Sequence, residues 1–96
     1  MRQNANLKAI TSNLVNIQKA AEMVAAEKNM PITNVNDEDG NGDVFNALGN
    51  WPKGPGSVKY SVSGGEAIAT LGENKPPLPE EYKDATKISY TEVASQ

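Results

Sequence analysis

The sequence predicts an α+β fold, in which a long N-terminal helix packs on a three-stranded antiparallel sheet. Three observations support this prediction: an N-terminal segment without internal Gly or Pro, a later region of alternating apolar and polar residues, and a Gly-Gly pair within that region. The 96 residues suffice for a single domain with one modest core. We divide it into a helical stem (1–29), an irregular αβ loop with a short helix (30–56), and the sheet with a Pro-rich loop (57–96).

Apolar residues in the first 28 positions recur at spacings of three and four, which places them on one helix face. They are Leu7, Ile10, Leu14, Ile17, Ala21 and Val24. A helix over 4–28 is about 37 Å long, whereas a domain of this size has a radius of gyration of about 13 Å. We therefore expect part of the helix to project from the body.

The two ends of this helix carry different signals. Pro31 ends it, with Asn29 and Met30 at the exit. No capping residue marks the start, and Arg2 and Lys8 stand where the helix dipole favours carboxylates. We therefore expect the helix to continue upstream of the first residue.

The αβ loop and the sheet follow from turn and strand signals. Asp43 is expected to cap a short helix over 43–48. Alternation over 57–63 predicts a half-buried strand, and the following Gly-Gly pair predicts a tight hairpin with a return strand over 66–71. A third strand is expected over 86–93.

The sheet needs an apolar cover, and the helix stripe is the largest one available. We expect packing on the chain's own sheet rather than a coiled coil. Each large side chain that becomes fully buried contributes roughly 1.5–3 kcal/mol. The expected contacts pair Leu14, Ile17, Ala21 and Val24 of the helix with Val58, Tyr60, Val62 and Ile88 of the sheet.

Composition argues against several functions. Neither His nor Cys occurs, which removes the commonest general base, the usual triad members and any disulfide. No phosphate-binding Gly-rich loop is present. We therefore expect no enzyme activity and no required cofactor. The net charge of −3 with scattered basic residues predicts no nucleic-acid partner.

The acidic run over 37–43 is the segment that could bind a metal. Asp37, Asp39 and Asn41 occupy alternate positions, and Asp43 adds a further carboxylate. This matches the first half of a calcium loop, but the ninth and twelfth positions lack the oxygen ligands that the second half needs. Two interpretations stay open: a calcium site formed by these four residues, or a solvated acidic loop of turn formers.

Two other features also allow two interpretations. Trp51, beside a proline, is expected to plug the core beneath the loop, and the alternative is an anchor for a binding partner. The Pro-rich segment 76–79 is expected to be a stiff spacer rather than a recognition motif.

The order of elements resembles the type IV pilin-like superfamily: a helix with a proline stop, a loop with a short helix, Trp-Pro, and an antiparallel hairpin. The passages that carry the resemblance are the stem 2–31 and the segment 48–55 leading into 60–65. The family's leader, cleavage site and apolar half-helix are not in this sequence, so no processing or assembly residue carries over. Many pilins have a C-terminal disulfide, which this chain cannot form. Major pseudopilins bind calcium after the sheet, whereas the acidic run here precedes it.

The resemblance implies the soluble headpiece of a type IV pilin or type II secretion pseudopilin, anchored in a membrane through an absent N-terminal segment. Such a chain is a structural subunit that polymerises into a filament. Its partners are identical or related pilin subunits and the pilus or secretion assembly machinery, and the helix near Asn6 to Asn13 contacts neighbouring subunits. It resides in the inner (cytoplasmic) membrane before assembly and then in an extracellular filament or at the cell surface.

Two other functions remain open from the sequence. One is an independent extracellular module that binds calcium or another ligand. The other is a helical oligomerisation domain fused to a small sheet.

Overall fold

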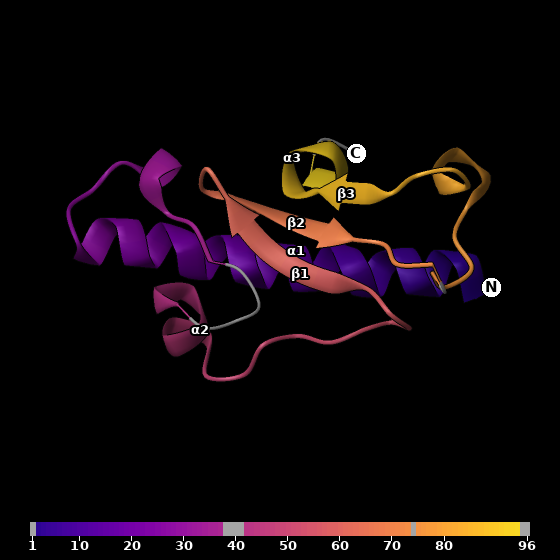
Figure 1. Ribbon diagram of the computed structural model, residues 1–96, viewed down its shortest axis with the longest axis horizontal. Coiled ribbons are helices and arrows are strands. Elements are labelled where there is room, and N and C mark those ends of the chain that lie inside the picture. Colours follow the sequence, from indigo (N-terminus) through magenta and orange to yellow (C-terminus); the bar gives the residue numbers. More distant parts are fainter. Residues whose placement is uncertain (1, 38–41, 74, 95–96) are drawn as a thin grey trace.

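The computed structural model describes residues 2–37, 42–73 and 75–94, and it has the expected α+β arrangement (Figure 1). A long helix lies beneath a three-stranded antiparallel sheet with strand order β1-β2-β3. In chain order the elements are α1 (Arg2–Glu27), the 3-10 turn η1 (Ile32–Asn34), α2 (Asp43–Leu48), β1 (Lys59–Ser63), β2 (Glu66–Thr70), the 3-10 turn η2 (Glu80–Tyr82), β3 (Lys87–Ser89) and α3 (Tyr90–Ala94).

The C-terminal end of α1 is closed by a backbone motif at the predicted exit. Asn29 has a positive φ of 53°, a conformation that asparagine tolerates better than most residues. The Met30 N–H then donates to the Ala25 carbonyl at 3.0 Å, and the Asn29 N–H donates to the Ala26 carbonyl at 3.2 Å. These are the two bonds of a Schellman cap, and Pro31 follows directly. The predicted exit of the helix is therefore confirmed.

The N-terminal part of α1 does not project, so that expectation is wrong. The 26 residues span about 39 Å at ~1.5 Å per residue, and the longest dimension of the molecule is 41 Å. The Pro-rich segment folds back over the first turns, where the Asn6 side-chain amide donates to the Pro77 carbonyl at 2.9 Å. Leu7 packs against the core at the same end. As Figure 1 shows, other elements lie along the whole length of α1.

The hairpin between β1 and β2 forms at the predicted Gly-Gly pair. Gly64 and Gly65 have φ values of 59° and 81°, and Ser63 pairs with Glu66 across them. Two positive φ values in a two-residue loop define the type I′ turn that suits the twist of a hairpin. A Cβ atom on Gly65 would clash with the Ile32 carbonyl oxygen, so close backbone approach also requires glycine at this position.

The third strand is shorter than predicted, because the chain turns into α3 at Tyr90 instead of continuing to Val93. A longer β3 would place residue 90 opposite Ala67, given that Ile68 pairs with Ser89. Gln18 of α1 occupies that role instead: its side-chain oxygen accepts from the Ala67 N–H at 2.9 Å. The last residues are thereby released from the sheet and form α3, which buries Val93 in the core.

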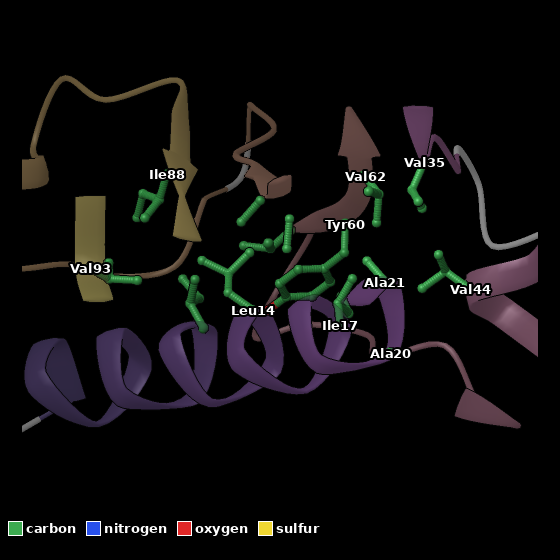
Figure 2. Close-up of a cluster of buried hydrophobic side chains, with 14 of the residues drawn as sticks. Leu14, Ile17, Ala20, Ala21, Val35, Val44, Tyr60, Val62, Ile88 and Val93 are labelled. Carbon is green, nitrogen blue, oxygen red and sulfur yellow. The ribbon is translucent and has the colours of Figure 1, made fainter. Parts of the chain in front are cut away.

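All the residues that were predicted to form the interface between helix and sheet belong to one buried cluster (Figure 2). The central strand β2 contributes two fully buried alanines, Ala67 and Ala69, which let α1 approach the sheet closely. Larger side chains on the outer strands fill the flanks, with Tyr60 above Leu14 and Ile17 in Figure 2. The predicted cluster members, each at most 4% exposed, are Leu14, Ile17, Ala21, Val24, Val58, Tyr60, Val62 and Ile88.

Candidate functional site

Asp37, the first residue of the acidic run, is buried and holds two parts of the fold together. Its N–H donates to the Val62 carbonyl at 2.9 Å, and its carbonyl accepts from the Val62 N–H at 2.7 Å. Its carboxylate accepts the N–H groups of Gly42 and Phe45, both at 3.0 Å. Since Phe45 is the third residue of α2, Asp37 caps this helix from outside it.

Asp43 does not cap α2, contrary to the prediction. The N-cap position is Gly42, and Asp43 is the first helical residue. A Cβ atom on Gly42 would lie 3.0 Å from the Asp37 carboxyl carbon, so the glycine leaves room for the distant cap. The Asp43 carboxylate instead forms an ion pair with Lys28 at 2.7 Å, with both side chains about half exposed.

The predicted calcium site stays a prediction. Of its four residues, Asp39 and Asn41 lie outside the described residues, and Asp37 and Asp43 are engaged with protein groups. Within 2–37, 42–73 and 75–94, no three acidic side chains are placed to hold a metal ion together. A cation bound here would have to share carboxylate oxygens that already accept hydrogen bonds.

Trp51 is half-buried against the core, as expected for a plug beneath the loop. Its indole N–H donates to the Tyr60 carbonyl at 3.2 Å, which attaches the ring to β1. The ring of Phe45 lies 6.3 Å away between centroids at a tilt of 41°, which attaches it to α2. The indole is therefore held on two sides.

The hydroxyl group of Tyr60 fixes the segment that joins Trp51 to β1. It donates to the Gly54 carbonyl at 2.6 Å and accepts from the Asn13 side-chain amide at 3.0 Å. Burial raises the pKa of Tyr60, and the hydrogen bond from Asn13 lowers this pKa by a smaller amount. The phenol therefore stays protonated at neutral pH and acts as a permanent donor to the loop.

A surface hollow of about 390 Å³ lies along this segment and is lined by residues 51–54 and 56–60. Its volume is within the range of small-molecule sites. Its lining includes the aromatic residue Trp51 and two basic residues, Lys53 and Lys59. The two lysines were not among the residues predicted from the sequence. The sequence feature that could have identified them is the lack of any acidic residue between Asp43 and Glu66.

The face of α1 that points away from the core carries small and polar side chains. Its exposed residues recur at spacings of four and three, as in a seam between two helices. Among the described residues, Met23 is the exposed large hydrophobic side chain, with 56% of its surface accessible. The members of this outer face are Ala5, Ala9, Ser12, Asn16, Lys19, Met23 and Ala26.

The segment near Asn6 to Asn13, expected to contact neighbouring subunits, divides between two roles. The side-chain amides of Asn6 and Asn13 bond within the chain, to the Pro77 carbonyl and to the Tyr60 hydroxyl of β1. Ala9 and Ser12 are instead exposed on the outer face.

Comparisons of this chain with protein-family models, with curated proteins and with solved structures found no match. Among the described residues, no helix combines the length and the apolar character needed to cross a membrane. The function must therefore be argued from the surfaces themselves.

Proposed function

We propose that this chain is a structural subunit of a type IV pilus or a related pseudopilus filament, and that it acts by polymerisation without catalysis. The observation that supports this most directly is the outer face of α1. The helix runs the length of the molecule (Figure 1). It buries one side only, and the other side exposes a row of mostly small residues.

Small side chains suit a helix surface that packs against other helices. The distance between two packed helices is 8–10 Å and depends on the side chains at the contact. Ala5, Ala9, Ser12 and Ala26 allow the shorter of these distances. A spacing of three and four keeps such a row on one side over several turns.

In the filament, the helices bundle in the centre, and the sheet and loops pack laterally outside. The proposal includes a hydrophobic anchoring segment ahead of Met1, as the resemblance to pilins implies. The partners are identical or related subunits and the pilus or secretion assembly machinery. The subunit resides in the inner (cytoplasmic) membrane before assembly and afterwards in the filament outside the cell.

The experiment replaces Ala9 by Arg in the complete gene, in its own host. Filaments are counted by electron microscopy after labelling with an antibody against this chain. We expect labelled filaments from the wild type and few or none from Ala9→Arg, because the long charged side chain prevents close helix packing. Ala47→Arg is the matched control, since Ala47 is also an exposed helical alanine but lies on α2.

Three outcomes would contradict the proposal. They are the absence of labelled filaments from wild-type cells, normal filaments from Ala9→Arg, and equal loss in both variants. A melting temperature of the purified Ala9→Arg chain within about 2 °C of the wild type shows that the fold is kept. A stable dimer of the purified wild-type chain in analytical ultracentrifugation would favour the oligomerisation-domain alternative instead.

A further inference from the structure

The hollow beside Trp51 has a rigid wall. The indole is attached to β1 through the Tyr60 carbonyl, and the opposite part of the loop is attached through the bond from the Tyr60 hydroxyl to the Gly54 carbonyl. Gly54 and Gly56 add no side chains that could fill the space. A site formed in advance costs a ligand less ordering entropy than a mobile loop would.

The hollow is also locally cationic within an acidic protein. The chain has a net charge of −3, but its 22 residues from Val44 to Gly65 contain two lysines and no acidic residue. Both lysines, Lys53 and Lys59, line the hollow and are exposed. Neither forms an ion pair with another described residue. Lys59 shares a second hollow with Glu73, again without an ion pair.

We propose that this hollow binds an acidic sugar, such as a uronic acid unit of a polysaccharide. The apolar side of the sugar ring lies against the Trp51 indole, and its carboxylate is bound by Lys53 and Lys59. The proposal does not depend on filament formation.

The donor set favours a carboxylate over a phosphate. Lysine binds either group as a point charge, whereas many phosphate sites add the paired N–H groups of an arginine or the N–H groups of a helix N-terminus. The lining of the hollow includes neither. Two exposed ammonium groups act as separate point charges, which suffice for the single negative charge of a uronic acid.

Trp51 is the sole tryptophan of the chain, so intrinsic fluorescence reports directly on the hollow. The purified chain is titrated with galacturonate and, separately, with galactose, which lacks the carboxylate. We expect a saturable change in Trp51 emission with galacturonate, weaker binding of galactose, and a loss of galacturonate affinity as salt is added. The purified chain is used, so the outcome is separate from whether filaments form in cells.

Substitution of each lysine tests the charge contribution. Lys53→Gln and Lys59→Gln are each expected to lower the affinity for galacturonate about two- to fivefold, as for exposed ion pairs, without changing the affinity for galactose. Lys87→Gln is the matched control, because Lys87 is an exposed strand lysine outside the hollow.

Several results would overturn the proposal. They are the absence of a saturable change with galacturonate, equal affinity for galactose, and unchanged affinity in both lysine variants. Tighter binding of adenosine monophosphate than of galacturonate would assign the hollow to a phosphate ligand instead.

Discussion

Replacing Gln18 by Leu tests the polar connection between α1 and the hairpin. The two side chains are similar in size, but leucine neither donates nor accepts a hydrogen bond. Gln18 is 8% exposed. Its amide nitrogen donates to the Gly65 carbonyl at 2.7 Å, and its oxygen accepts from the Ala67 N–H at 2.9 Å. The substitution therefore takes these partners away from two buried backbone groups.

The loss of stability follows from those two groups. A buried donor or acceptor that loses its partner costs about 1–3 kcal/mol, so the two together cost about 2–6 kcal/mol. The apolar atoms of the leucine recover roughly 1 kcal/mol through burial, which leaves a net loss of about 1–5 kcal/mol. For a domain with a free energy of unfolding of about 5–14 kcal/mol, this is a large fraction. The melting temperature is expected to fall by at least about 4 °C.

The assay is urea unfolding followed by Trp51 fluorescence and by far-ultraviolet circular dichroism. The midpoint should fall while the slope with urea stays constant, because the exposed surface of the unfolded chain changes little. Amide hydrogen exchange at Ala67 should become faster. Gln3→Leu is the control, since Gln3 is an exposed glutamine of the same helix, and we expect a change within about 0.5 kcal/mol.

The reasoning would be refuted if Gln18→Leu stayed within about 0.5 kcal/mol of the wild type. Unchanged protection of the Ala67 amide would refute it as well, because it would show that this N–H does not depend on the side chain of α1.

Four further predictions concern the core, the buried phenol, the acidic loop and two asparagines. Ile17→Ala is expected to cost about 2–5 kcal/mol in urea unfolding, because Ile17 is fully buried, and an unchanged melting temperature would contradict the packing. Burial raises the pKa of Tyr60, so the unfolded chain loses the phenol proton first. Stability should therefore fall as the pH rises above about 10, and Tyr60→Phe should reduce that decline in urea titrations at several pH values. If the acidic loop binds calcium, a chelator lowers the melting temperature of the wild type but not that of Asp39→Ala. A wild-type melting temperature that is the same with and without chelator would contradict the calcium site. Asn13→Ala should destabilise the purified chain by about 1–2 kcal/mol, whereas Asn16→Ala should stabilise it by about 0.5 kcal/mol in thermal melts, and effects of the same sign would contradict their assignment to different faces.

The parts of the fold that could be predicted are those set by neighbouring residues. The buried face of α1 follows from the spacing of Leu14, Ile17 and Ala21, because helix periodicity is a local property. The turn at Gly64 and Gly65 follows from the need for two positive φ values.

The parts that could not be predicted depend on side chains far away in the sequence. The alternation over 86–93 suits a strand, but Gln18 satisfies the N–H that a longer β3 would have bonded, and the chain turns into α3. Asp37 likewise caps α2, although it lies six residues before Asp43, the first residue of this helix. Local cap rules consider only adjacent residues, and they therefore assigned this role to Asp43. The hollow forms where the bonds of Tyr60 attach Trp51 and Gly54 to β1, and no spacing rule encodes these bonds.

The polar residues of α1 explain how one helix serves both the fold and the proposed assembly. Asparagine is a mediocre helix former, so each one in a helix interior must be compensated elsewhere. Asn6 and Asn13 are compensated within the chain, because their amides bond to the Pro77 carbonyl and the Tyr60 hydroxyl. Asn16, on the outer face, makes no side-chain hydrogen bond to a described residue. If its compensation comes from a neighbouring subunit, Asn16→Ala stabilises the isolated chain and weakens the filament, a combination that a role in the monomer alone does not produce.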